Sequence, residues 1–377
     1  MKKLLSNIGI IAIVFFVIFL CLELLLRLTS YGALMSIVTF DESTGYRLLP
    51  NKKITYKTKT YSFDIKINSL GLRDQEFSKN EVVGQKPIIF LGDSQTFGHG
   101  LQMEESYPEL VEKEFHCRTI NAGCVGWGID QSLLYLEHYG IDFSPRAVVL
   151  GISLGSDLQD MNGEFNEKFI ASDYKALRML VSQIRRGERK DSLGRVIKSY
   201  LRCHSQAFSF LADKARVVSK LLVLRFNRKN STSREYLPDL LQLYYNKRPY
   251  FSKSVEANYR KLDEILLDFK SFCRANQIKF YVLLIPHKVQ VSDMEWGTIL
   301  KMYSLKTEDF DRSLPQKKII EFCDLNGIAV IDGTLLFREH YKQSNELLYF
   351  NNDAHMNSSG HRILANQVTA FLLKQRD

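Results

Sequence analysis

The sequence has little cysteine, and none of it falls in a metal-binding pattern. Six cysteines occur in 377 residues, without a C-x-x-C pair or a Cys/His cluster at the spacing that metal sites use. Because Cys21 lies in an apolar stretch, an odd number remains outside it. A disulfide framework is therefore not expected, although a single bridge in an exported domain stays open.

The sequence also lacks internal repeats and low-complexity tracts, which argues against a repeat array. Hydrophobic residues make up 45% and charged residues 25% of the chain, an ordinary globular composition that excludes a disordered chain. Outside the apolar start, the length suits one large domain or a domain with an insertion.

Acidic residues are scarce in one stretch. The chain has a formal net charge of +9, and residues 185–229 hold thirteen Lys or Arg against Glu188, Asp191 and Asp213. This stretch accounts for the whole positive excess. We interpret residues of about 160–250 as a basic helical insertion, suited to an anionic polymer or to lipid headgroups. A solvated helical face is the alternative, and nucleic acid is not expected, because no nucleic-acid-binding fold is apparent.

Only one run is long and apolar enough to cross a membrane. It covers residues 8–26, carries Glu23 as its one charge and is preceded by Lys2 and Lys3. Its length approaches the ~20 residues that span a bilayer core. We expect a single-pass anchor in residues 1–28, with a cleaved signal peptide or a buried helix as alternatives. The two lysines place the body of the protein on the non-cytoplasmic side, periplasmic or extracellular, although Arg27 on the other flank weakens the bias.

The body alternates between short apolar strands and helices. An alternating stretch at 53–68 predicts a strand pair within a lead-in segment at 29–85. From residue 86 the pattern predicts a parallel sheet covered on both faces, an α/β fold. The predicted strands are 87–91, 118–121, 147–152, 279–285 and 328–331; the predicted helices are 106–116, 129–140, 255–274, 311–325 and 357–373.

A serine follows the first of these strands directly, in Gly92-Asp93-Ser94. Parallel sheets present reactive groups at this edge, and a serine hydroxyl becomes nucleophilic when a base is near. The alternative is that Asp93 or Ser94 only caps the next helix.

A carboxylate and an imidazole precede the closing helix, in Asp353-Ala354-His355. The imidazole would take the serine proton, and the carboxylate would fix its tautomer. The alternative is a polar helix start with Asn357 or Ser358 as the N-cap.

Together these two motifs resemble the SGNH/GDSL hydrolase superfamily. Ser94 matches the nucleophile of its first block, and Asp353 and His355 match the acid and base of its last. The segment 121–126 resembles the second block. The resemblance implies a three-layer α/β/α sandwich with a parallel sheet in residues 86–377, no metal or organic cofactor, and an oxyanion hole built from the N–H groups of Ser94 and Gly126.

The chain departs from the family pattern in two places. Ser156 stands where the third block has an asparagine that completes the oxyanion hole, and losing one such donor costs about 10²–10³ in rate. Either Ser156 substitutes, or Asn162 reaches in, or the enzyme is slow. The second departure is that Asp353 lies two residues before His355, where many members have three. This spacing resembles anchored, envelope-facing members; Asn352 is a weaker candidate for orienting the base.

Four other residues are candidates for lesser roles. Trp127, next to Gly126, is a candidate for stacking on a substrate, and His287 is a candidate contact after the fourth strand. His99 has a weaker claim to the site, and His361 is expected to be structural.

We therefore expect a serine esterase acting on acyl esters, such as O-acetyl groups on carbohydrate. An O-acyltransferase that modifies an envelope polysaccharide is one alternative, and a catalytically inactive envelope binding module is another. Protein partners are not indicated by the sequence.

Overall fold

The computed structural model describes residues 2–28, 33–58, 60–160, 201, 205–212, 214–215, 218–219, 253–303, 305–351 and 353–375. Nearly all of the predicted basic insertion, together with Asn162 and Asn352, lies outside these residues.

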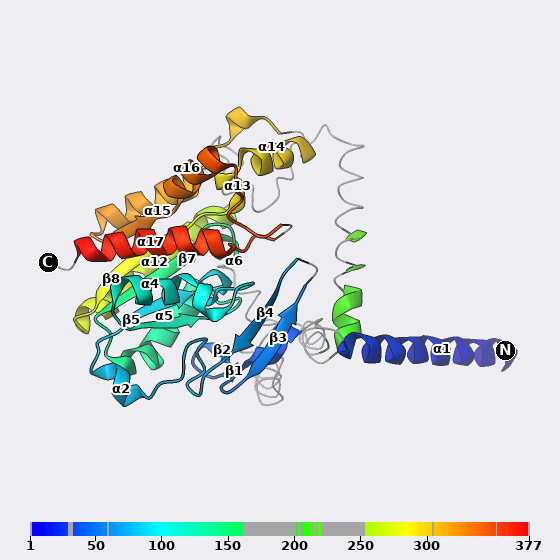
Figure 1. Cartoon of the computed structure of the whole chain (residues 1–377). Helices are drawn as coiled ribbons and strands as arrows, with labels where there is room; N and C mark the ends of the chain where they lie inside the picture. The colour runs from blue at the N-terminus through cyan, green and yellow to red at the C-terminus, as the bar shows by residue number, and fades with distance from the viewer. Residues whose placement is uncertain are drawn as a thin grey trace.

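The chain starts with one long helix, α1 (Lys2–Arg27). Its segment Gly9–Arg27 has a mean hydropathy of 3.0 and is long and apolar enough to cross a membrane, by length and composition. Figure 1 shows α1 projecting away from the body of the protein. Glu23, the acidic residue of this segment, accepts hydrogen bonds from Ser205 Oγ at 2.8 Å and from the N–H of Ala207 at 2.9 Å. The end of the apolar helix is thereby joined to a piece of the insertion.

Two antiparallel hairpins follow α1. The first pairs β1 (Val38–Asp41) with β2 (Gly45–Leu48), and the second pairs β3 (Lys53–Lys57) with β4 (Ser62–Lys66). The second hairpin confirms the strand pair predicted at 53–68. Strand β4 buries alternate residues, which is the pattern of a strand with one face on a core and one in water.

The main domain is built on five parallel strands in the order β6-β5-β7-β8-β9. This confirms the predicted α/β fold. The strands are β5 (Ile88–Gly92), β6 (Thr119–Gly123), β7 (Ala147–Ser153), β8 (Lys279–Ile285) and β9 (Ala329–Asp332).

Helices cover both faces of this sheet. One face packs Ile89 and Val148 of the sheet in a core with residues of α5, α12 and α15. The opposite face packs Phe90 and Val149 with residues of α4, α16 and α17. The sheet therefore has a buried apolar cluster on each face, as is typical of parallel sheets. The helices are α2 (Lys79–Val83), α3 (Ser94–Phe97), α4 (Tyr107–Phe115), α5 (Ile129–His138), α6 (Asp157–Asp160), α12 (Lys253–Ala275), α13 (Lys288–Val291), α14 (Asp293–Met302), α15 (Leu314–Leu325), α16 (Thr334–Ser344) and α17 (Ser358–Lys374), with short 3₁₀ turns at Ala33–Ile37, Met103–Glu105, Gly140–Phe143 and Thr307–Asp309.

The order in which strands are added to the sheet changes side between β5 and β7, which run parallel to each other. From β5 the chain first adds β6 on one side and then returns to add β7 on the other. Ligands of open α/β sheets bind in the crevice that such a reversal leaves beyond the carboxyl ends of the strands. The residues that follow β5 and β7 are therefore where a site is expected.

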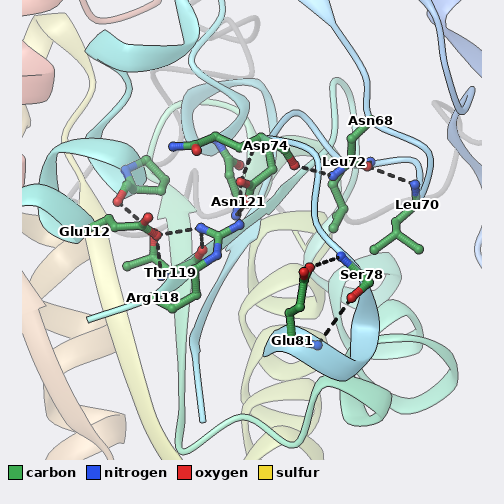
Figure 2. Close-up of polar contacts among 12 residues, drawn as sticks. Asn68, Leu70, Leu72, Asp74, Ser78, Glu81, Glu112, Arg118, Thr119 and Asn121 are labelled. Carbon is green, nitrogen blue, oxygen red and sulfur yellow. Dashed lines mark hydrogen bonds and ion pairs between the residues drawn. The ribbon is translucent and has the colours of Figure 1, made fainter. Parts of the chain in front are cut away.

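The segment between β4 and β5 is fixed to the sheet edge by a buried ion pair, drawn in Figure 2. Asp74 accepts from Arg118 Nη2 at 2.7 Å and from the N–H of Asn121, on β6, at 3.1 Å. Asn68 shapes the preceding turn by accepting from the N–H groups of Leu70 and Leu72, both at 3.0 Å. The lead-in segment is thus attached to the main domain by polar contacts as well as by packing.

The carboxyl group of Glu109 lies near this ion pair and gives the fold a pH dependence. Burial, followed by the nearby carboxylates of Asp74 and Glu112, raises the pKa of Glu109 from the ordinary glutamate value of 4.5 to about 7. Between these two pH values the folded state holds a proton that the unfolded state releases. The free energy of unfolding therefore falls as the pH rises through this window.

We expect Glu109→Gln to remove this dependence and to raise the free energy of unfolding at pH 8 by about 1–3 kcal/mol. Urea unfolding of both proteins at pH 5 and pH 8 measures it. Glu114→Gln, an exposed position on the same helix, is the matched control. An equal pH dependence in Glu109→Gln and wild type would contradict the assignment.

Candidate active site

The predicted nucleophile lies on a tight turn between β5 and α3. Gly92 has a φ of 150°, and a Cβ there would come within 2.3 Å of Thr96 Oγ1 and 2.8 Å of the Gly151 carbonyl oxygen. Only glycine fits this turn. Asp93 caps α3 by accepting from the N–H of Gln95 at 2.9 Å, so the capping alternative holds for Asp93 while the Ser94 hydroxyl is left for another partner.

That partner is His355. Its Nε2 lies 2.8 Å from Ser94 Oγ, and its Nδ1 lies 2.6 Å from Asp353 Oδ1. An ionised carboxylate only accepts, so Nδ1 carries the proton and Nε2 is free to accept the serine hydroxyl. Burial opposes ionisation of Asp353, but hydrogen bonds from His355 and Tyr61 hold the pKa of Asp353 well below its usual range. The structure thus brings together the three residues that the sequence predicted as a triad.

The loop that carries the acid and base is joined to the nucleophile turn by Gln95. This side chain accepts from the N–H of Met356 at 3.1 Å and donates to the carbonyl of Ala354 at 3.0 Å. Both contacts flank His355 directly. The sequence analysis did not single out Gln95. Its position directly after Ser94 was the one signal that its side chain would lie near the catalytic loop.

The segment after the nucleophile is held by a fully buried arginine. The Nη1 atom of Arg73 donates to the carbonyls of Phe97 and Gly98, both at 2.7 Å, and its Nη2 atom donates to the carbonyl of Leu101. Arg73 belongs to the lead-in segment. A residue that precedes the first strand of the parallel sheet therefore fixes the backbone that follows Ser94.

A second lead-in residue reaches the triad itself. Tyr61, between β3 and β4, donates to Asp353 Oδ2 at 2.6 Å, and its hydroxyl lies 3.0 Å from His99 Nε2. Ligand-type atoms of His99, Asp353 and His355 lie within 4.8 Å of one another, close enough for a metal ion. The Tyr61 hydroxyl already joins two of these residues, and the Asp353–His355 hydrogen bond joins the third, so the cluster is a hydrogen-bond network.

Two backbone N–H groups are available for an oxyanion. Ser94 opens α3, where the first N–H groups have no partner within the helix. Gly126 has a φ of 74°, and among the hydrogen bonds of the described residues none is donated by its N–H. Both residues are half-buried.

Ser156, predicted as the third oxyanion donor, already has an acceptor. Its hydroxyl donates to Asp93 Oδ2 at 3.1 Å, and Ser153 Oγ donates to Asp93 Oδ1 at 2.9 Å. Burial raises the pKa of Asp93 and these hydrogen bonds oppose the rise. Because a hydroxyl has a single proton, Ser156 reaches an oxyanion only by leaving Asp93.

The structure corrects the prediction for Trp127. Its side chain is 3% exposed, its indole N–H donates to the Tyr46 carbonyl at 2.9 Å, and its ring packs on Tyr135. It therefore packs the first hairpin onto the domain, where no substrate can stack on it.

Two other histidines named as candidates from the sequence, His287 and His361, have structural contacts. His287 caps α13 by accepting from the N–H of Val289, and a Cβ on Gly155 would come within 2.3 Å of its ring. It thus lies beside the segment that ends in Ser156, although its role as a substrate contact stays a prediction. His361 is fully buried on α17 and accepts from the N–H of Tyr107 at 3.0 Å, which confirms a structural role.

No protein-family model matches the chain, and no curated protein matches it in sequence. Among solved structures it is similar to an acetyl xylan esterase, with 15% identity, a TM-score of 0.40 and coverage of 76% of this chain and 99% of the other. It is also similar to a GDSL-like lipase from Bacteroides thetaiotaomicron, with 13% identity, a TM-score of 0.36 and coverage of 78% and 90%. A third is a member of the lipolytic G-D-S-L family from Veillonella parvula, with 12% identity, a TM-score of 0.39 and coverage of 77% and 99%. These values are too low to transfer the activities in these names to this chain.

Proposed function

We propose that this protein is a serine esterase of SGNH/GDSL type that cleaves acyl esters, including O-acetyl groups on carbohydrate. The observation that carries the proposal is the continuous hydrogen-bond chain from Ser94 Oγ through His355 to Asp353, with spacings of 2.8 and 2.6 Å. Such a chain activates a hydroxyl that is otherwise a weak nucleophile.

In the proposed reaction, Ser94 Oγ attacks the ester carbonyl while His355 Nε2 takes the hydroxyl proton. The N–H groups of Ser94 and Gly126 stabilise the oxyanion. Collapse of this intermediate releases the alcohol, which receives the proton from His355 and leaves the acyl group on Ser94. Water, activated by the same imidazole, then releases the acid and restores the serine.

We further propose that α1 anchors the enzyme in a membrane, with the active site on the non-cytoplasmic side. The supporting features are the apolar segment Gly9–Arg27 and the lysines that precede it. The anchor would hold the site near envelope polymers. An acceptor hydroxyl of such a polymer, in place of water, would make the protein an O-acyltransferase.

The test uses the purified full chain in detergent and a short-chain aryl ester. We expect ester cleavage above the buffer rate, and inactivation by a fluorophosphonate with the adduct mapped by mass spectrometry to the peptide that contains Ser94. Acid release that is independent of added carbohydrate identifies an esterase, whereas turnover that requires a carbohydrate hydroxyl identifies a transferase. Absence of both cleavage and labelling would overturn the proposal and leave the binding module.

A further inference from the structure

We propose that Tyr61, on the lead-in hairpin, is a positioning residue that fixes the orientation of Asp353 and so completes the active site. The inference rests on the proposed function, because it concerns the acid of the same triad. It assigns to a segment outside the α/β domain a part in catalysis.

The contacts of Asp353 carry the first step. Its Oδ1 accepts from both the ring Nδ1–H and the backbone N–H of His355, at 2.6 and 3.1 Å. Its Oδ2 accepts from Tyr61 at 2.6 Å, and no other hydrogen bond to Oδ2 occurs among the described residues. Without Tyr61 the carboxylate is held on one oxygen only, by a residue two positions away on the same loop. A carboxylate so held is free to turn about its side-chain bonds, and His355 then loses its fixed tautomer.

The tip of the hairpin is itself held in place. The Tyr61 N–H donates to Thr58 Oγ1 at 3.0 Å, and the Thr58 N–H donates to the Tyr61 carbonyl at 2.9 Å. The centroid of the Tyr61 ring lies 4.5 Å from that of the Phe350 ring. Phe350 precedes Asp353 by three positions. Tyr61 therefore contacts the catalytic loop in two ways: its ring packs on Phe350, and its hydroxyl donates to Asp353.

The direction of each hydrogen bond extends the network to His99. Tyr61 has one hydroxyl proton, and the Asp353 carboxylate can only accept it. The contact between Tyr61 and His99 Nε2 is then a hydrogen bond only if Nε2 carries a proton and donates. Burial, with the neighbouring His355, lowers the pKa of His99 to about 3, so its ring is neutral at working pH. The chain of donors thus runs from His99 through Tyr61 to Asp353, and the ring of His99 also lies 4.2 Å from that of His355.

The kinetic test compares Tyr61→Phe with Tyr56→Phe in the full chain in detergent. The first variant removes the hydroxyl and keeps the ring contact with Phe350. The second removes the hydroxyl of a tyrosine whose ring lies 5.6 Å from that of His99 and which donates no hydrogen bond to the triad among the described residues. We expect Tyr61→Phe to lower kcat by roughly tenfold, the worth of one charge-assisted hydrogen bond, with KM within about twofold of wild type. Tyr56→Phe should keep the wild-type kcat.

A measurement that needs no turnover separates this inference from the proposed function. Histidine-selective ¹⁵N labelling reports which ring nitrogen of His99 and His355 is protonated, with assignment through a His99→Gln variant. In the wild type we expect a neutral His99 with its proton on Nε2. In Tyr61→Phe, but not in Tyr56→Phe, we expect mixed tautomers of these two histidine rings.

Two results would overturn the inference. One is a His99 proton on Nδ1 in the wild type, because Tyr61 would then donate to His99 and not to Asp353. The other is a Tyr61→Phe protein with wild-type kcat and unchanged ring signals. A chain that shows the expected tautomers but neither Ser94-dependent ester cleavage nor fluorophosphonate labelling would refute the proposed function and keep the positioning role of Tyr61.

Discussion

Ser94→Ala is expected to lower kcat for ester cleavage by roughly 10⁴–10⁶, to the rate that remains when a triad nucleophile is lost. The physical reason is that alanine has no atom to form the acyl-enzyme, while His355 and Asp353 keep their contact at 2.6 Å. KM for whatever activity remains should change little, because the hydroxyl contributes to the reaction more than to ground-state binding.

The measurement is the initial rate with the short-chain aryl ester at saturating concentration, together with fluorophosphonate labelling. Ser69→Ala, in the exposed turn before Arg73, is the control for loss of a serine hydroxyl, and should leave kcat unchanged. Thermal unfolding confirms that both variants fold. A Ser94→Ala protein that keeps more than a tenth of the wild-type rate would show that another group is the nucleophile.

The second large effect is on stability, at Arg73. This guanidinium is fully buried and donates to three carbonyls after the nucleophile turn and to that of Asp64 on β4. Burial lowers the pKa of Arg73 to about 10, so it stays charged at neutral pH. Its hydrogen bonds are therefore charge-assisted, and each contributes roughly 1.5–3 kcal/mol to stability before the cost of burying the charge is subtracted.

We expect Arg73→Met to lower the free energy of unfolding by about 3–5 kcal/mol, because the thioether fills much of the space and leaves buried carbonyls without donors. Arg73→Lys keeps the charge but not the planar fork that reaches several carbonyls at once, so it should lose less than Arg73→Met. Urea unfolding at pH 7 measures both. A loss below about 1 kcal/mol in Arg73→Met would mean that the buried charge costs as much as its hydrogen bonds contribute.

The sheet was predictable because its signal is local. The strand at 279–285 was predicted with the bounds that β8 has, and the other four differ by a residue or two at their ends, where assignments vary most. Helix α16 was missed because it buries only Thr334 and Phe337, too few apolar positions to show a helical period. The first hairpin was missed because its turn depends on the Asp41 side chain, which accepts from the N–H groups of Ser43 and Thr44.

The triad was predictable for a different reason. Ser94, Asp353 and His355 lie in short motifs whose residue types are tied to a chemistry, so their meeting followed from the resemblance. Tyr61 has no such motif, and it contacts Asp353 across 292 positions of sequence. Nothing in the order of residues tells which tyrosine of a hairpin will face the acid. The contact of Ser156 with Asp93 was equally hidden, because it depends on side-chain rotation and not on position in the chain.

The order of the site along the chain has a consequence for biosynthesis. Ser94 is separated from His355 by 261 positions, and the loop that carries the base follows all five strands of the sheet. Under the proposed mechanism, the nucleophile is therefore synthesised long before its base, and the serine of a nascent chain cannot yet be activated. Under the proposed mechanism, a chain truncated shortly before residue 353 would keep all five strands of the sheet and would be inactive.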